Sequence, residues 1–287
     1  MANELDRLSA LELATRMNRA DARVSRAVRG ALPQIAEAIE VIRERLSRGG
    51  RLIYVGSGTS GRIGALDASE CPPTFGTAPA MVQAMIAGGN EALEIASEGS
   101  EDSAELGASD MAGRRPGRKD VVVGLSASGN TPYTVAALQH ARRKGAATIA
   151  VVCRKGSELA KVCGIAIEAE VGAEVLEGST RLKAGTAEKM ICNMLTTGAM
   201  ARLGYVYGNL MVQVQMKNAK LVERGIAIVR RVAKIERPVA VRALDQAEGK
   251  IPVALVMLRA GVTKAEAVRR LRRAGGNIRA AMEISED

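Results

Sequence analysis

Serine, threonine and glycine gather in two short segments of this chain, and residues of these types bind phosphate groups. The first segment, GSGTSG at 56–61, follows the apolar run 51–55 and precedes a helical pattern. A strand, a glycine-rich turn and a helix present free backbone N–H groups at the helix N-terminus, which favours a bound anion. Glycine lets the backbone approach the ligand, and hydroxyls donate hydrogen bonds. The candidate phosphate-binding residues here are Ser57, Gly58, Thr59 and Ser60.

The second segment, SASGNTP at 126–132, has the same chemistry. It follows the run 121–125, which is apolar at every position but one, as in a parallel sheet covered by helices. Thr131 suits the N-cap of the next helix and Pro132 its first position. Parallel strands place such loops at one edge of a sheet, so the sequence predicts a phosphorylated ligand held by both. The candidates are Ser126, Ser128, Gly129 and Thr131.

A carboxylate segment, DASECPPT at 67–74, follows the first loop. The pattern predicts a helix through Ala68 and then an acid held by Pro72 and Pro73, which is a candidate proton donor or acceptor. The only histidine, His140, lies inside a predicted helix, where a surface or packing role is the usual one. Acid–base chemistry must therefore use carboxylates, Lys, Tyr or Cys, and Cys71 has no neighbouring histidine to activate it.

Two basic residues, Arg181 and Lys183, stand near the start of a long helix predicted to end at about Leu203. Cations at this position oppose the helix dipole, which favours a role in binding an anionic substrate. Ser179 or Thr180 is expected to cap the helix.

The periodicity predicts an α/β domain between helical ends. Helices are expected over 3–29 and from Pro33 onward, and again from 209 to about 235, followed by three short helices and a closing segment. The expected domains are 1–41, 42–205 and 206–287. The expected strands are 51–55, 81–86, 121–125, 147–152 and 165–169.

The amino-acid composition argues against several kinds of binding partner. The 287 residues carry a net charge of +10, but only five are aromatic, which leaves little for stacking nucleic-acid bases. An anionic small substrate explains the charge as well, so no nucleic-acid partner is expected. The four cysteines lack CxxC spacing and the chain has one histidine, so a structural metal site is not expected. With no signal peptide and no apolar run near 18 residues, the chain is predicted to be cytoplasmic, with no membrane partner.

Several of these segments resemble a known family. GSGTSG, SASGNTP and EGSTRLKAGTAEK resemble the sugar isomerase (SIS) fold, in which a mainly parallel sheet lies between two helical layers. LDASECPPTFG, IAGG, EGSEDS, VGAEV and YGNLMV look like the N-acetylmuramic acid 6-phosphate etherases, over residues 35–220. The C-terminal helices resemble the small, ubiquitin-associated-like helical subdomain of that family.

The resemblance implies a reaction and a site. The expected reaction cleaves the D-lactyl ether of N-acetylmuramic acid 6-phosphate and gives N-acetylglucosamine 6-phosphate and D-lactate, for recycling of cell-wall sugars. It implies that Glu70 is the acid that assists departure of lactate and that Glu101 is the second essential carboxylate. It also implies a homodimer that uses neither metal nor organic cofactor.

Three other functions are compatible with sugar-phosphate loops. A non-catalytic sensor of sugar phosphates, like the glucokinase regulatory protein, would lack a catalytic glutamate or carry two such domains. A DNA-binding regulator would need a helix-turn-helix, and residues 1–50 show no clear tight turn between their helices. An aldose–ketose isomerase would share proton abstraction at carbon 2, and only the resemblance of DASECPPT argues against it.

Overall fold

The computed structural model describes residues 4–95, 98–214, 216 and 218–284. Contacts between Cα atoms divide the chain into two units. The first unit is Met1–Ser69 with Ala80–Thr196, and the second is Glu70–Pro79 with Thr197–Asp287. The expected domains were three continuous ranges, whereas each of these units consists of two segments, and residues 70–79 are grouped with the C-terminal helices. The expected domain limits therefore stay a prediction.

The first unit is built on a five-stranded parallel sheet with the strand order β2-β1-β3-β4-β5. All five expected strands are present, and β1 and β3 are buried along their whole length because helices cover both faces. This confirms the α/β class and the mainly parallel sheet. The strands are β1 (Leu52–Gly56), β2 (Val82–Ile86), β3 (Val121–Ser126), β4 (Ala147–Val152) and β5 (Ile165–Glu168).

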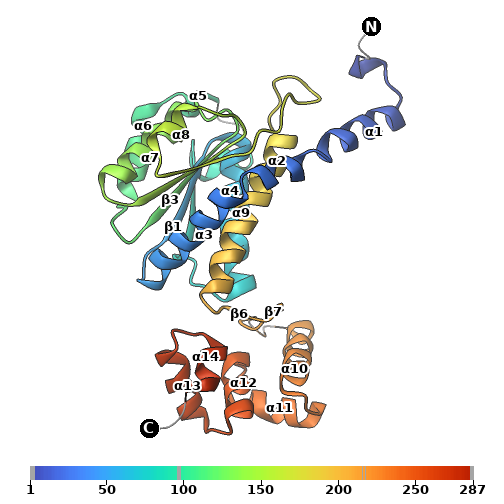
Figure 1. Cartoon of the computed structure of the whole chain (residues 1–287), viewed down its shortest axis with the longest axis vertical. Coiled ribbons are helices and arrows are strands. Elements are labelled where there is room, and N and C mark those ends of the chain that lie inside the picture. The colour runs from blue at the N-terminus through green and yellow to red at the C-terminus, as the bar shows by residue number, and fades with distance from the viewer. Residues whose placement is uncertain (1–3, 96–97, 215, 217, 285–287) are drawn as a thin grey trace. The chain divides into compact units, whose positions relative to one another are not determined.

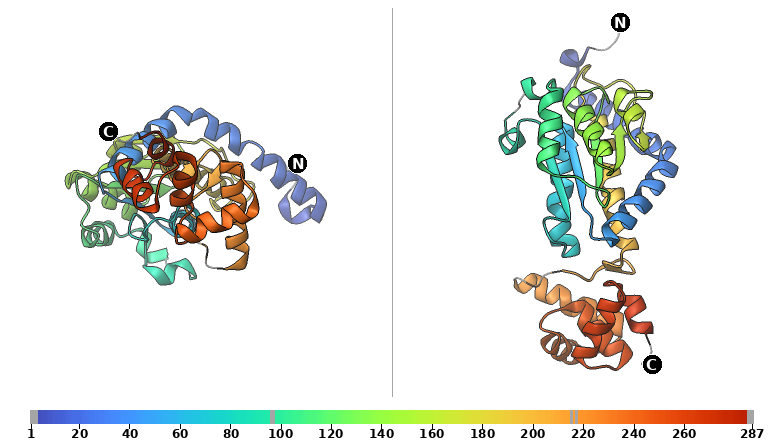
Figure 2. Two further views of the ribbon diagram at one scale, coloured as in Figure 1. Left: turned by 90° about the horizontal axis from the view of Figure 1, so that it is seen from below. Right: turned by 90° about the vertical axis from the view of Figure 1, so that its left-hand side faces the viewer.

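Helices form a layer on each side of this sheet. Figure 1 shows α6, α7 and α8 on one side, and α3 with the first parts of α4 and α9 on the other. Seen from the side of α6, α7 and α8, these helices lie in front of the sheet (Figure 2). The bounds are α1 (Ala10–Asp21), α2 (Val24–Gly30), α3 (Leu32–Ser47), α4 (Gly58–Phe75), α5 (Glu98–Glu101), α6 (Ala104–Gly113), α7 (Pro132–Arg143), α8 (Glu158–Val162) and α9 (Lys183–Arg202), with 3-10 helices at Leu5–Arg7 and Asn90–Leu93.

The described part of the expected helical segment 3–29 is divided into a 3-10 helix, α1 and α2, and α1 begins only at Ala10. Ser9 and Glu12 form a reciprocal capping box at the start of α1, in which the Ser9 hydroxyl accepts from the Glu12 backbone N–H. The described part of α1 has no buried residue, and Leu11 is 78 % exposed. Pro33 lies in the first turn of α3, whose apolar stripe is buried at Ile35 and Ile42.

Helix α4 is longer than expected. It continues past Ala68 to Phe75, so Glu70 and both prolines lie inside the helix. The backbone N–H of Gly76 still donates to the carbonyl of Pro72, at 2.9 Å, which closes the last turn. The expectation that the acid follows the end of the helix was therefore wrong.

The second unit is helical around an aliphatic core, which confirms the small helical C-terminal region. The helices are α10 (Ala219–Ala233), α11 (Arg237–Gln246), α12 (Ile251–Ala260), α13 (Lys264–Arg273) and α14 (Ile278–Glu283). The core draws side chains from α10, α11, α12, α13 and α14, together with Val212 and Val214.

A hairpin replaces the start of one expected helix. Residues 209–235 do not form one helix, because β6 (Val206–Tyr207) pairs antiparallel with β7 (Leu210–Met211). The helix begins only after Asn218, whose side chain caps it by accepting from the Leu221 backbone N–H. Within the described part of the chain, no helix is long and apolar enough to cross a membrane.

Candidate functional site

The first glycine-rich loop joins β1 to α4. Gly58 has a φ of +51°, and a Cβ on Gly61 would lie 2.8 Å from the carbonyl oxygen of Gly56, so both positions require glycine. The side-chain hydroxyl of Ser57 is buried and has no hydrogen-bond partner among the described residues. A buried hydroxyl without a partner costs free energy, so a ligand that bonded to Ser57 would remove this cost.

The second loop joins β3 to α7 and gathers three hydroxyls. The Ser126 hydroxyl lies 3.0 Å from that of Thr131 and 3.4 Å from that of Ser128, and it accepts from the Gly129 backbone N–H. Thr131 occupies the N-cap position, as expected, but its side chain bonds Ser126 instead of the helix backbone. Gly129 has a φ of +70°, and a Cβ there would collide with Ser157.

The two loops follow neighbouring parallel strands. Gly56 at the end of β1 pairs in register with Leu125 near the end of β3. Both loops therefore leave the same edge of the sheet, and each opens a helix at that edge. This is the position at which open α/β sheets bind ligands.

A buried glutamate lies directly behind the first loop. Glu188 on α9 is 1 % exposed, and its carboxylate oxygen Oε1 accepts from the Ser60 hydroxyl at 2.8 Å. Burial raises the pKa of Glu188 to about 8, and the hydrogen bond from Ser60 acts in the opposite direction but is weaker. Near neutral pH this carboxyl therefore carries its proton.

The raised pKa of Glu188 predicts a stability that depends on pH. A free glutamate side chain loses its proton near pH 4.5, whereas Glu188 in the folded protein holds it until about pH 8. Because the folded state binds more protons in that window, the free energy of unfolding falls as the pH rises from 4.5 to 8, by up to about 1.4 kcal/mol per pH unit. The contribution is full below this window and lost above it.

Glu188→Gln is expected to remove that decline, since an amide does not titrate and can still bond Ser60. Urea unfolding at several pH values between about 5 and 9 measures the effect. The matched control is Glu37→Gln, at an exposed position of α3. A wild-type protein whose stability follows the same pH curve as Glu188→Gln would contradict the assignment.

Asp67 joins α4 to neighbouring elements by hydrogen bonds. Its carboxylate accepts from the Tyr54 hydroxyl at 2.9 Å and from the Asn193 side-chain amide at 2.7 Å. The Thr196 hydroxyl adds a longer bond of 3.3 Å. Burial raises the pKa of Asp67, although these hydrogen bonds act to lower it. Through these contacts Asp67 holds α4 against β1 and α9.

The start of α9 is capped by a residue that the sequence analysis did not select. Glu174 accepts from the backbone N–H groups of Lys183 and Ala184, at 3.1 and 2.9 Å, whereas Ser179 and Thr180 precede the helix by several residues. The expected cap at these two residues was therefore wrong.

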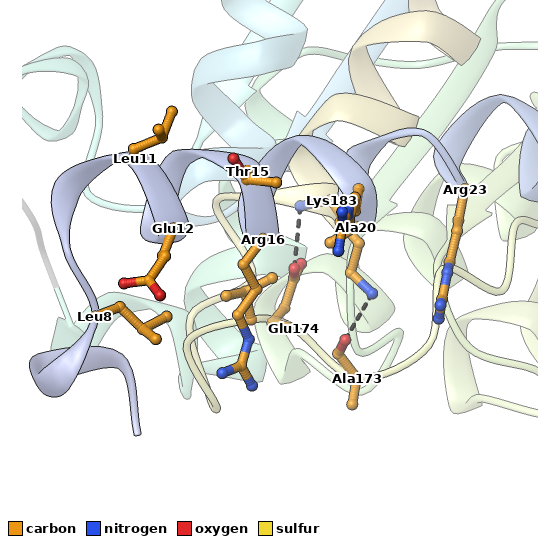
Figure 3. A pocket seen from close by; sticks show the side chains of 12 residues that line it. Leu8, Leu11, Glu12, Thr15, Arg16, Ala20, Arg23, Ala173, Glu174 and Lys183 are labelled. Carbon is orange, nitrogen blue, oxygen red and sulfur yellow. Dashed lines mark hydrogen bonds between the residues drawn. The ribbon is translucent and has the colours of Figure 1, made fainter. Parts of the chain in front are cut away.

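Lys183 is one of the expected substrate-binding residues and is 4 % exposed. Its ammonium donates to the carbonyls of Val171 and Ala173, at 2.7 and 2.6 Å. It lines a cavity of about 730 Å³ next to α1 and the 173–175 segment, into which Arg16 and Arg23 also project (Figure 3). Arg181 is exposed outside this cavity. Substrate binding by Lys183 and Arg181 stays a prediction.

The two expected catalytic glutamates belong to different units. Glu101 is an exposed residue at the end of α5, which packs against α7, the helix that opens at the second loop. Glu70 is an exposed residue of α4 and falls in the second unit. The candidate nucleophile Cys71 is excluded by burial, since it is 2 % exposed, and His140 lies within α7 as expected.

Glu70 lines a cavity of about 640 Å³ within the second unit. The wall is largely apolar and includes Pro72, Met211 and Val214, together with the polar residues Thr74, Thr77 and Arg224. Thr77, Arg224 and Glu188 were not among the candidates from the sequence. The sequence pattern could have identified Glu188, because it lies at helical spacing from the apolar residues Ala184, Ile191 and Leu195. A charged residue on such a buried stripe needs a partner.

Comparison with known proteins gives matches over nearly the whole chain. Residues 34–142 match the glucokinase regulatory protein N-terminal SIS domain, and residues 107–198 match the SIS domain. The N-acetylmuramic acid 6-phosphate etherase of Mycolicibacterium smegmatis is 54 % identical over 279 residues, which are 97 % of this chain and 94 % of that protein. The etherase of Symbiobacterium thermophilum is 55 % identical over 260 residues, 90 % and 86 % of the two chains. That of Aeromonas hydrophila is 50 % identical over 275 residues, 96 % and 92 %.

Solved structures share the fold at low identity. A phosphoheptose isomerase from Francisella tularensis has a TM-score of 0.51 at 16 % identity, over 66 % of this chain and all of that one. An E. coli protein that was solved as a complex has a TM-score of 0.50 at 17 % identity, over 70 % and 97 % of the two chains. These likenesses agree with the parallel sheet and its helical layers.

Proposed function

The chain belongs to the N-acetylmuramic acid 6-phosphate etherase family, and we propose that Glu70 and Glu101 carry out the reaction of that family. This chain is a carbon–oxygen lyase that cleaves the D-lactyl ether at carbon 3 of N-acetylmuramic acid 6-phosphate. The products are N-acetylglucosamine 6-phosphate and D-lactate, which returns a cell-wall sugar to metabolism. The observation that carries this conclusion is about 50 % identity to named etherases over nearly the full chain.

An ether is a poor leaving group unless a neighbouring carbanion expels it. Opening of the sugar ring produces an aldehyde, which acidifies the hydrogen on carbon 2. In the proposed mechanism the Glu101 carboxylate removes this hydrogen, and the C2–C3 double bond forms as the C3–O bond breaks. Glu70, in its protonated form, gives its proton to the departing ether oxygen. Water then adds across the double bond, and each such proton transfer contributes about 10²–10⁴-fold to the rate.

The two hydroxyl-rich loops are the proposed grip on the phosphate. The candidates are those selected from the sequence, with Ser57 and the Ser126–Thr131 pair best supported by their geometry. Binding energy from the phosphate, which does not react, holds the sugar for the chemistry at carbons 2 and 3. Arg181 and Lys183 remain candidates for the same anion.

We infer that the protein acts as a homodimer in the cytoplasm. The exposed apolar side of α1 offers surface for a second copy to cover. All four cysteines are free thiols, which fits a reducing compartment.

One preparation of the purified protein tests this function. We expect D-lactate and N-acetylglucosamine 6-phosphate to appear in equal amounts from N-acetylmuramic acid 6-phosphate, and light scattering to give twice the chain mass of 30.1 kDa. Binding of the sugar phosphate without release of lactate would instead support the sensor. Conversion between aldose and ketose phosphates without lactate would support the isomerase.

A further inference from the structure

The cavity that Glu70 lines has an arginine in its wall, and no ion pair of that arginine is seen within the described residues. Arg224 lies on α10, and its Nη2 donates to the sulfur of Met211 at 3.4 Å, which is a weak acceptor. The adjacent acid, Glu223, is held by Arg237 through two bonds of 2.6 and 2.7 Å. The guanidinium fork of Arg224 is therefore available to a ligand.

A second group in the wall also has no partner. Thr77 is 4 % exposed, and its hydroxyl has no hydrogen-bond partner within the described ranges. Burying a hydroxyl without a bond is costly, so a ligand that bonded to Thr77 would remove this cost. Because Thr77 lines the cavity, its hydroxyl is a candidate donor to a molecule bound there.

We propose that this cavity binds the carboxylate of the D-lactyl group, with the Arg224 guanidinium as its cation and the Thr77 hydroxyl as a second donor. The proposal rests on the proposed function, because the lactyl group must lie beside Glu70 when that residue gives its proton to the ether oxygen. An arginine fork matches a carboxylate with two parallel hydrogen bonds. The apolar side chains of Val214 and Leu221 suit the lactyl methyl group.

This site makes the protein distinguish the ether from its sugar product. N-acetylmuramic acid 6-phosphate carries the lactyl carboxylate, whereas N-acetylglucosamine 6-phosphate has a hydroxyl in its place. The phosphate loops bind both sugars alike, so any preference for the ether must come from contacts with the lactyl group. Arg224 and Thr77 are thus binding residues, and replacing either should lower the affinity for the ether but not for N-acetylglucosamine 6-phosphate.

The test measures Kd by calorimetry for both sugars, in the full-length Glu70→Gln protein, which is expected to convert the ether only slowly. Adding Arg224→Gln should weaken binding of the ether by about 10- to 100-fold, as expected for a hydrogen-bonded charge, and leave binding of the product sugar unchanged. Adding Thr77→Val, which keeps the side-chain shape, should weaken the ether alone by about 2- to 10-fold. Thr77→Val should not lower the melting temperature, because the lost hydroxyl made no bond.

The control is Arg231→Gln, an exposed arginine of the same helix outside the cavity, which should change neither Kd. Equal weakening of both sugars by Arg224→Gln, or none, would overturn the subsite. A separate result would reject the proposed reaction. If the wild-type protein released no lactate but its preference for the ether still depended on Arg224, the subsite would stand and the lyase function would be rejected. Lactate release together with an Arg224→Gln protein of unchanged preference would reject the subsite alone.

Discussion

Glu70→Gln is expected to slow the release of D-lactate by about 10²- to 10⁴-fold, the usual contribution of a general acid. Glutamine has nearly the same shape but cannot give a proton to the ether oxygen. Since Glu70 is exposed on the wall of its cavity, the substitution should leave the fold intact. The assay is lactate formation under saturating substrate, with the melting temperature as a check on folding.

Hydrogen exchange at carbon 2, measured on the same variant, distinguishes the role of Glu70 as the acid from that of the base. Proton removal at carbon 2 does not need Glu70, so Glu70→Gln should still exchange that hydrogen with deuterium from the solvent. Glu37→Gln serves as the control with full activity, because Glu37 is an exposed acid of α3. Lactate release within a factor of about two of wild type in Glu70→Gln would exclude Glu70 as the acid, since a general acid contributes far more.

Glu101→Gln should stop both lactate release and hydrogen exchange at carbon 2, each by about 10²- to 10⁴-fold. The proposed base acts before the C–O bond breaks, so its loss leaves no carbanion to expel lactate. Proton NMR in deuterated buffer follows the exchange, and a lactate assay follows the elimination.

Glu105→Gln is the matched control, because Glu105 is an exposed acid in the same acidic segment, in the first turn of α6. It should behave as wild type in both assays. If Glu101→Gln lost lactate release but kept the exchange, Glu101 would act after proton removal, and another group would have to be the base.

The sheet and both loops could be predicted because their signals are local. The apolar residues of β1 and β3, followed directly by glycine and hydroxyl residues, predict buried parallel strands and phosphate loops without knowledge of distant contacts. The end of α4 could not be predicted in this way. Pro72 and Pro73 usually end a helix, but here Cys71 and Phe75 are buried, and their packing carries the helix further.

The parts of the site that were missed depend on contacts across the chain. Glu188 reaches Ser60 over 128 positions of sequence, and only the fold brings the two together. Glu174 caps α9 from a loop, although Ser179 and Thr180 have the residue types that favour a cap. Thr77 and Arg224 lie in segments without a motif, and only the folded chain places both in the wall of one cavity.

The protonated state of Glu188 has a consequence for natural variation in this family. A carboxyl that keeps its proton resembles a primary amide in size, shape and hydrogen-bonding capacity. Evolution can therefore exchange glutamate and glutamine at this position without loss of the bond to Ser60. Aspartate is one methylene shorter and would not reach Ser60 in the same way, and a lysine would bury a positive charge at a position that is 1 % exposed. We therefore expect related proteins to carry either glutamate or glutamine at this position, although the exchange changes the formal charge.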